Sequence, residues 1–241
     1  TTEIYTLSLH DALPIFGKIE EKFDDLDQNS LSGASLGQVH RATKNGQQVI
    51  VKVRRPGIEK QVERDLKVLM KIIPFAMKFV DPNLRFSIIP IMKQFDESIH
   101  EAMDYSKESE NLKKIKKNME LYDNVVIPHV HYDYSTKTVL TMEYIPGIKV
   151  TNIEELDKKG IDRQKLVIDV HKVFFTMLLR HSIFHADPHP GNISVRDDGT
   201  LILYDFGMIG RLNNETRLRL VRLYLALVEK NPPRTVNAMD E

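Results

Sequence analysis

Three oxygen-bearing side chains in the C-terminal part of the chain have the types and spacing needed for metal-assisted chemistry. Asp187 lies two positions after His185, and Asn192 lies five positions after Asp187. An Asp-Phe-Gly tripeptide then begins at Asp205. Oxygen ligands such as those of Asn192 and Asp205 suit a hard cation such as Mg²⁺, whereas the carboxylate of Asp187 is suited to accept a proton or to orient a water molecule. Each aspartate alone is also typical of an ordinary turn, so only the combination predicts a site.

The segment between Asn192 and Asp205 predicts how these side chains are brought together. Apolar runs at 193–195 and 201–204 flank the turn sequence Asp-Asp-Gly-Thr at 197–200, a pattern typical of a hairpin. Because the two ends of a hairpin are neighbours, Asn192 and Asp205 are expected at the same end. The protein-kinase catalytic loop has the form His-x-Asp-x-x-x-x-Asn and precedes an Asp-Phe-Gly metal motif. This resemblance to the kinase loop therefore implies a site for ATP and Mg²⁺.

A lysine inside an apolar run is the second candidate group. Lys52 interrupts the β-branched run 49–53, and a buried lysine needs a carboxylate or phosphate partner. Kinases use such a lysine to hold the α- and β-phosphates, and a helix glutamate steadies it. Glu108, on a predicted helix, is the candidate partner. Two other interpretations stay open: an edge-strand lysine kept for solubility, and a glutamate on a solvated acidic face.

A run of small residues precedes the lysine strand. It reads Ser32-Gly33-Ala34-Ser35-Leu36-Gly37-Gln38-Val39 and stands where a kinase has its glycine-rich loop. Small side chains let backbone N–H groups approach phosphate oxygens closely. No Gly-Lys-Ser/Thr follows, so the run is not a P-loop. As a bare pattern it is also typical of a simple turn.

The remaining pattern predicts the elements that position these groups. Strands are expected within 37–53, joined by an Asn45-Gly46 hairpin turn, and at 125–128 and 138–144. Helices are expected at 58–80 with an interruption at Pro74, from Ile91 to about Met119 after a loop at 81–83, and at 152–156 and 163–181. A final helix is expected at 215–230. Strands in the first and middle parts and helices at the end predict an α+β fold.

Composition narrows the classes of function. The chain has 241 residues, and its 34 basic residues balance 34 acidic ones, so charge gives no argument for nucleic-acid binding. The absence of cysteine excludes disulfides, thiolate catalysis and Cys-ligated zinc. No apolar run approaches the roughly 18 residues of a membrane span. We therefore expect a cytoplasmic protein whose contact with a membrane, if any, is peripheral.

These segments together resemble the UbiB (aarF-domain, ADCK-type) family of atypical protein-kinase-like proteins. The resemblance rests on the sequences at 35–42 and 51–58, on Asp104-Tyr105 with Glu108, and on the loop and tripeptide at 185–207. There are three departures from the family pattern. The alanine-rich loop contains Gly33, the family's Glu-x-Asp is out of register because Ala102 stands two positions before Asp104, and the N-terminal Lys-x-Gly-Gln motif is absent.

The resemblance implies a two-lobed kinase-like fold, ATP and Mg²⁺ as cofactors, and ATPase activity more readily than protein phosphorylation. It also implies support of ubiquinone or other isoprenoid-lipid biosynthesis, with an isoprenoid lipid or quinone-pathway proteins as partners. By this resemblance Asp187, Lys52 and Glu108 are catalytic, and Asn192 and Asp205 hold the metal. The residues implied to bind the nucleotide are Ser32, Gly33, Ala34, Ser35, Gly37, Gln38, Lys52, Glu143 and Tyr144, the last two as the hinge.

The expected organisation is an irregular or non-native leader at 1–15, a strand-containing N-lobe with extra helices at 16–145, and a mainly helical, truncated C-lobe at 146–241.

Two other functions stay open. One is a small-molecule phosphotransferase of the aminoglycoside or choline kinase type, which shares a similar loop but usually has a tryptophan in its metal motif, and this chain has none. The other is a non-catalytic, ATP-dependent switch that binds a lipid or a protein. The apolar stretch 66–80, with interleaved lysines, either packs on the lobe or lies on a membrane surface.

Overall fold

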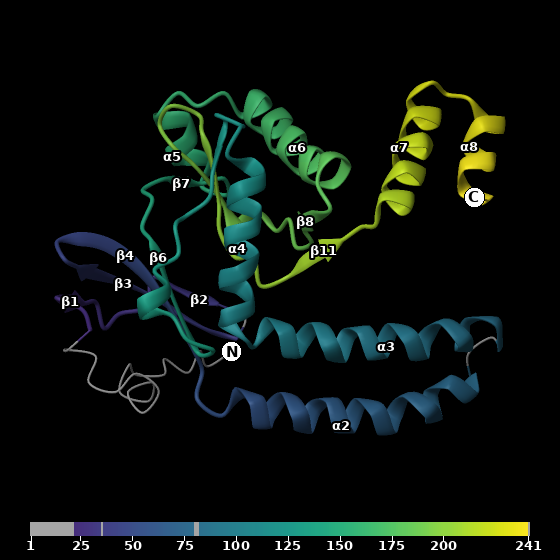
Figure 1. Cartoon of the computed structure of the whole chain (residues 1–241), viewed down its shortest axis with the longest axis horizontal. Helices are drawn as coiled ribbons and strands as arrows, with labels where there is room; N and C mark the ends of the chain where they lie inside the picture. The colour runs from purple at the N-terminus through teal and green to yellow at the C-terminus, as the bar shows by residue number, and fades with distance from the viewer. Residues whose placement is uncertain (1–21, 35, 80–81, 241) are drawn as a thin grey trace. The chain divides into compact units, whose positions relative to one another are not determined.

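The computed structural model describes residues 22–34, 36–79 and 82–240 (Figure 1). They fall into two compact units. The first extends to Glu110 and includes His129–Tyr144, whereas the second comprises Asn111–Pro128 and the residues from Ile145 onward. Sheets and helices occur together, so the α+β prediction is confirmed. Among the described helices, none has the length and apolar character needed to cross a membrane.

An antiparallel sheet forms the centre of the first unit. Its strands run in the order β1 (Asp25–Leu26), β3 (Gly37–Lys44), β4 (Gln47–Arg54) and β6 (Val139–Glu143), and β2 (Ser32–Ala34) also pairs with β3. Asn45 and Gly46 have φ values of 51° and 73°, as the predicted two-residue hairpin turn requires. The prediction of this hairpin is therefore confirmed.

The strand register separates the two faces of this sheet. Lys52 is paired with Val39 on one side and with Leu140 on the other, so these three side chains share a face. The opposite face carries an apolar core made of Phe23, Ala42, Val49, Val51, Val53 and Val139. Because β4 has a neighbour on each side, Lys52 is on a central strand and not on an edge.

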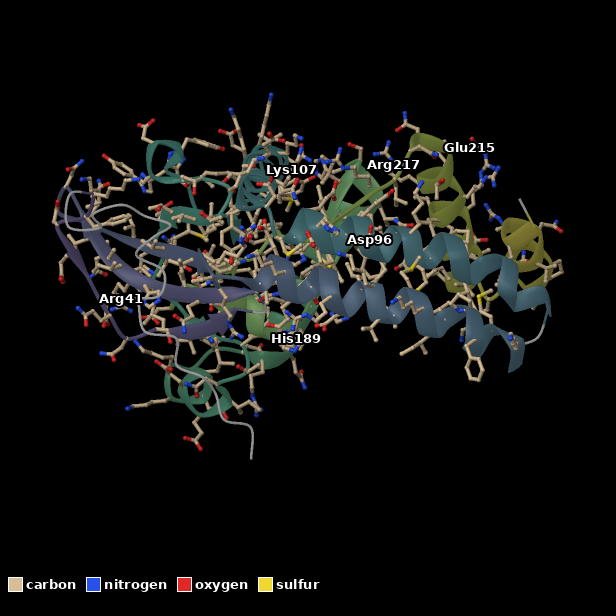
Figure 2. All side chains as sticks on the ribbon, turned by 90° about the horizontal axis from the view of Figure 1, so that it is seen from below. Arg41, Asp96, Lys107, His189, Glu215 and Arg217 are labelled. Atoms are coloured by element: carbon tan, nitrogen blue, oxygen red, sulfur yellow. The ribbon has the colours of Figure 1, made fainter. Side chains whose placement is uncertain are left out.

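Two long helices follow β4 in the first unit. Helix α2 (Ile58–Ala76) and helix α3 (Pro82–Ala102) lie side by side in both views, with a short 3₁₀ turn, Met77–Phe79, after α2 (Figures 1 and 2). The predicted interruption at Pro74 is wrong, because α2 continues to Ala76. Helix α3 begins at Pro82 rather than at Ile91, and proline is favoured in the first helical turn, where its missing N–H has no intrahelical partner to lose.

A break between two helices replaces the single helix predicted to end near Met119. Helix α3 ends at Ala102, and helix α4 (Tyr105–Met119) begins after Asp104. The Asp104 side chain accepts a hydrogen bond from the backbone N–H of Ser106 at 2.9 Å. An aspartate at this position satisfies a free N–H group of the first turn and so favours a new helix start.

The second unit combines small sheets with helices. One sheet has the order β5 (Val125–Val126), β10 (Leu201–Leu203), β9 (Ile193–Val195) and β7 (Ile148–Lys149), and β8 (Ile183–His185) pairs with β11 (Ile209–Arg211). The helices of this unit after β7 are α5 (Ile153–Lys158), α6 (Arg163–Arg180), α7 (Asn214–Val228) and α8 (Pro232–Asp240). The helix predicted at 215–230 is present as α7, but it is not the final one, since a further helix, α8, begins at Pro232.

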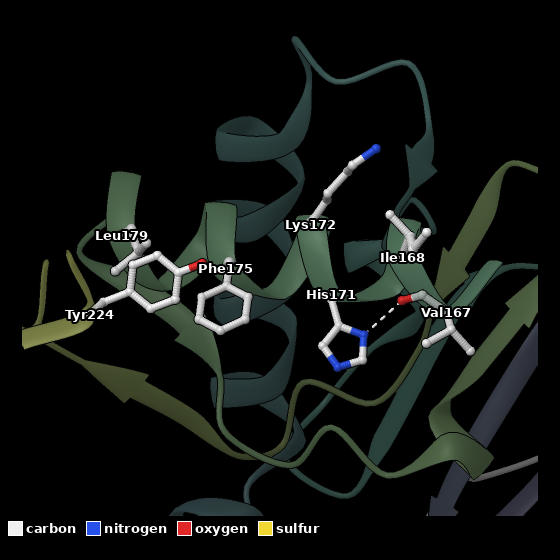
Figure 3. Close-up of a pocket in the computed structure, with 7 residues that line it drawn as sticks. All are labelled: Val167, Ile168, His171, Lys172, Phe175, Leu179 and Tyr224. Carbon is white, nitrogen blue, oxygen red and sulfur yellow. Dashed lines mark hydrogen bonds between the residues drawn. The ribbon is translucent and has the colours of Figure 1, made fainter. Parts of the chain in front are cut away.

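Helices α6 and α7 leave an apolar groove beside their contact (Figure 3). The Phe175 and Tyr224 rings pack with centroids 5.5 Å apart. His171 on the groove wall donates from Nδ1 to the carbonyl oxygen of Val167 at 2.7 Å. The groove has a volume of about 370 Å³, and none of the residues predicted to act on a nucleotide lines it.

Candidate active site

The predicted pair of Lys52 and Glu108 forms a buried ion pair in the first unit. The Lys52 Nζ lies 3.0 Å from both Oε1 and Oε2 of Glu108. The two side chains are only 8% and 1% exposed. The ammonium group also lies 5.2 Å from the ring centroid of Tyr105. Glu108 is therefore buried and not part of a solvated helix face, although the role of the pair in binding a nucleotide stays a prediction.

Gly37 allows the strands and helix α4 to approach closely beside this pair. A Cβ atom at Gly37 would lie 2.3 Å from the carbonyl oxygen of Val53 and 2.5 Å from the hydroxyl of Tyr105. Neither distance is possible for a real side chain, so this glycine is required for packing. The sequence indicated only that a small residue here would let the backbone approach a phosphate. Ser35 lies outside the described residues, and Ser32, Gly33 and Ala34 are described only as the backbone of β2.

The predicted hinge residues end strand β6 and are held by neighbouring segments. The backbone N–H of Glu143 donates to the carbonyl of His129 at 2.8 Å, and that of Tyr144 donates to the carbonyl of Gln48 at 3.3 Å. Arg41, labelled in Figure 2, lies over the Tyr144 ring at 4.4 Å from its centroid and donates to the Tyr144 hydroxyl at 2.9 Å. The sequence analysis missed Arg41, because an arginine in an alternating strand is typical of a solvent-facing position.

In the second unit, His185 organises the loop that carries Asp187. The backbone N–H of Asp187 donates to His185 Nδ1 at 3.1 Å. The neutral ring must therefore carry its proton on Nε2, which donates to the carbonyl of Tyr204 at 3.3 Å. Burial lowers the pKa of His185, and the Tyr204 carbonyl with the charges of Asp205 and Asp187 opposes this shift. His185 also packs against the Phe206 ring, with centroids 4.7 Å apart, so it links the loop to the Asp-Phe-Gly tripeptide.

The hairpin between Asn192 and Asp205 is present, as predicted. Strands β9 and β10 pair with Leu203 opposite Ile193, and the Tyr204 N–H donates to the Asn192 carbonyl at 3.0 Å. The residues on either side of the hairpin therefore lie at the same end of it. The Asn192 side-chain amide lies 3.5 Å from a carboxylate oxygen of Asp187. These contacts bring the loop and the start of the tripeptide together through the backbone.

Asp205 has a left-handed backbone conformation, with φ of 55°. This conformation is uncommon for residues other than glycine, although aspartate and asparagine tolerate it best. The next residue, Phe206, has a fully buried side chain. The Asp205 carboxylate accepts a hydrogen bond from the Gly207 N–H at 3.3 Å. A backbone outlier of this kind is more frequent at functional sites than elsewhere.

Asn111 is a second residue of this region that the sequence analysis did not assign a role. Its side-chain amide donates to the carbonyl oxygen of Phe206 at 3.1 Å, and both residues are buried. The bond ties helix α4 to the tripeptide within the second unit. The only signal in the sequence was a carboxamide in a helical segment, where asparagine has no advantage in helix propensity.

Asn192 and Asp205 carry the oxygen ligands that Mg²⁺ prefers, although their binding of the ion stays a prediction. No group of three or more His, Asp or Glu side chains within the described ranges forms a ready metal cage. Mg²⁺ does not require one, because it usually keeps several waters and takes one or two carboxylates together with phosphate oxygens. One carboxylate and one carboxamide at the same end of a hairpin are sufficient for that mode of binding.

The fold and these side chains define a protein-kinase-like domain, and comparison with known proteins identifies its family. Residues 15–239 match the family model described as the ABC1 atypical kinase-like domain, and the chain belongs to this family. A structure of an Rv3197–erythromycin complex from Mycobacterium tuberculosis is similar in fold, with a TM-score of 0.73 and 24% identity over 95% of this chain and 58% of that chain. The predicted kinase-like fold and the resemblance to UbiB proteins are confirmed.

Curated relatives are similar over most of this chain. The Arabidopsis thaliana protein ACTIVITY OF BC1 COMPLEX KINASE 8, chloroplastic, is 39% identical over 92% of this chain and 30% of its own length. The probable protein kinase UbiB of Marinobacter nauticus is 35% identical over 88% of this chain and 40% of its own length. The chain thus spans less than half of the length of these relatives.

Proposed function

We propose that this chain is a UbiB-type atypical kinase or ATPase that binds ATP together with Mg²⁺. The observation that carries the proposal is the enclosed pair of Lys52 and Glu108. Two apolar residues of similar size are generally at least as stable in such a position as a buried ion pair. A buried charged pair between a central strand and a helix is therefore better explained by a polyanionic ligand, and the triphosphate of ATP is the ligand that kinase-like folds bind with this pair.

Each candidate side chain has a distinct role in the proposed reaction. Lys52 neutralises charge on the α- and β-phosphates, and Glu108 holds the lysine in place. Asp187 accepts a proton from the attacking hydroxyl or orients the attacking water. Asn192 and Asp205 hold Mg²⁺, which neutralises phosphate charge when it is bound. Transfer of the γ-phosphoryl group to water gives ADP and inorganic phosphate.

We also infer a role in ubiquinone or other isoprenoid-lipid biosynthesis, with peripheral contact to a membrane. Relatives named as UbiB kinases support the first part of this inference. Helix α2 supports the second, because Val68, Ile72 and Phe75 are exposed at helical spacing. Lys67 and Lys71 are exposed beside this apolar stripe, which is the charge expected near an anionic lipid surface.

A thermal-shift experiment tests the nucleotide site. The melting temperature of the chain is measured with and without millimolar ATP and Mg²⁺, since a ligand present at 100 times its Kd stabilises a protein by about 2.7 kcal/mol. Asp205→Asn should abolish the Mg²⁺-dependent shift, and it should keep the fold because asparagine tolerates the left-handed conformation. Asp123→Asn, at an exposed loop position, is the matched control and should keep the full shift.

The outcome separates the proposed ATPase from a non-catalytic switch. A cooperative melt without any shift would contradict the nucleotide site. A shift with release of inorganic phosphate, lost in Asp187→Asn, supports the ATPase. A shift without phosphate release in the unmodified chain would favour a non-catalytic switch.

A further inference from the structure

A second cavity lies at the C-terminal end of helix α4, within the second unit. Its volume is about 330 Å³, which is at the lower end of the range of about 300–1,000 Å³ typical of small-molecule sites. Helix α4 and the segment that continues into strand β5 form its walls. None of the residues assigned to ATP or Mg²⁺ lines it. The cavity is called the lysine cavity below.

Three lysines and one glutamate supply the charge of the lysine cavity. Lys113, Lys116 and Lys117 line it, together with Glu120. The lysines are spaced at i, i+3 and i+4 on α4 and therefore share one helix face. Lys116 donates from Nζ to the carbonyl oxygen of Ile127 at 3.0 Å, which fixes one cation at the wall. Three lysines against one glutamate give the cavity a net positive charge, which favours an anion.

The inner wall of the lysine cavity is apolar. Met119, Val125 and Ile127 line it and are themselves almost fully buried. Tyr122 adds a partly buried aromatic ring. An apolar wall with a small number of grouped cations is the pattern of a site that binds a mostly apolar molecule and fixes its one charged end. Inorganic phosphate alone would leave this wall without a partner.

We propose that the lysine cavity binds an amphipathic organic anion, with a phosphate or carboxylate head on an apolar stem. The head contacts the exposed lysines at positions 113 and 117, and the stem lies against Met119, Val125 and Ile127. The volume of the lysine cavity admits the head and a short part of the stem. This proposal does not depend on ATP binding, because it uses a different set of residues.

Isothermal titration of the full chain with n-octyl phosphate, below its micelle concentration, tests the proposal. Two comparison ligands separate the parts of the site: inorganic phosphate has the head alone, and n-octyl glucoside has the same stem with a neutral head. We expect n-octyl phosphate to bind at least about tenfold more tightly than either, because inorganic phosphate lacks the stem that contacts the apolar wall and n-octyl glucoside lacks the charge that the lysines attract. Equal binding of inorganic phosphate would overturn the apolar part of the proposal. Equal binding of n-octyl glucoside would overturn the ionic part.

Paired substitutions locate the binding site. Lys113→Gln combined with Lys117→Gln should weaken binding of n-octyl phosphate by about tenfold or more. The matched control combines Lys158→Gln on helix α5 with Lys165→Gln on helix α6, which removes the same charge from exposed positions outside the cavity and outside the proposed membrane face. Unchanged affinity in the first variant, or equal loss in the control, would overturn the assignment to the lysine cavity. A thermal melt of each variant verifies that it is folded.

A vesicle experiment identifies the source of the anion. Sedimentation with vesicles containing phosphatidic acid, lost in the Lys113/Lys117 variant but not in the control, assigns a membrane lipid to the lysine cavity. Retained binding of n-octyl phosphate without vesicle binding assigns a soluble amphipathic anion instead. Failure of the chain to bind n-octyl phosphate would overturn both forms of the proposal, whatever the result with ATP.

Discussion

Removing one partner of the buried pair of Lys52 and Glu108 should destabilise the first unit strongly. At 3.0 Å and an effective dielectric constant of about 20, their Coulomb attraction is about 5.5 kcal/mol. Desolvation of the two groups offsets much of this attraction in the intact pair. Truncation of one partner leaves the other charge buried without compensation, which typically costs about 3–5 kcal/mol. We therefore expect Lys52→Met and Glu108→Leu each to lower the free energy of unfolding by about 3 kcal/mol.

The double variant Lys52→Met with Glu108→Leu should recover most of that loss. It leaves no buried charge, and apolar replacement of a buried ion pair is often neutral or stabilising. Urea denaturation of the single and double variants at neutral pH, followed by circular dichroism, measures the coupling. The double variant should at the same time lose the thermal shift with ATP and Mg²⁺, because it lacks the lysine that is proposed to bind the phosphates.

The exposed pair Lys67–Glu63 provides a matched control on helix α2. Its charged atoms are 3.7 Å apart, and both side chains are more than half exposed. Lys67→Met should therefore change the free energy of unfolding by about 0.5 kcal/mol or less. If the double variant at positions 52 and 108 were as unstable as the sum of its single variants, the argument that the pair is retained for a ligand would be refuted.

Three further substitutions test the packing and protonation of the fold. Gly37→Ala should destabilise by about 1–3 kcal/mol, since its Cβ would overlap the Val53 carbonyl, and a urea midpoint equal to that of the unmodified chain would contradict this. Asn111→Leu should cost about 1–3 kcal/mol by leaving a buried carbonyl unpaired, measured the same way, and a neutral effect would show that the bond is dispensable. Burial lowers the pKa of His40 below 6.5, so the unfolded state binds a proton more readily and stability falls as pH drops below about 6.5. His40→Gln should flatten this fall in a melting series from pH 7.5 to 5, whereas His100→Gln, at an exposed position, should not, and an unchanged slope in the first variant would refute the assignment.

Local patterns in the sequence were sufficient for the elements whose causes are local. The Asn45-Gly46 turn follows from the positive φ angles that these two residues tolerate best. The hairpin before Asp205 follows from two short apolar runs around a turn sequence, and it alone requires Asn192 and Asp205 to be near each other. The kinase-like fold was predictable for the same reason, because its motifs keep fixed spacings along the chain. Helix ends were less predictable, since α2 continues past Pro74 whereas Pro232 begins a new helix.

Contacts between residues distant in sequence could not be read from local patterns, and the pair of Lys52 and Glu108 was expected only from the resemblance to kinases. Glu108 was one of several acids in its helix, and only the position of α4 beside β4 shows that its carboxylate is 3.0 Å from Lys52. Arg41 and Asn111 were ordinary polar residues until the sheet and helix placed them against Tyr144 and against Phe206. Spacing along the chain specifies local geometry, but the partner of a side chain depends on which elements pack together. That packing is determined by burial of apolar surface over the whole unit.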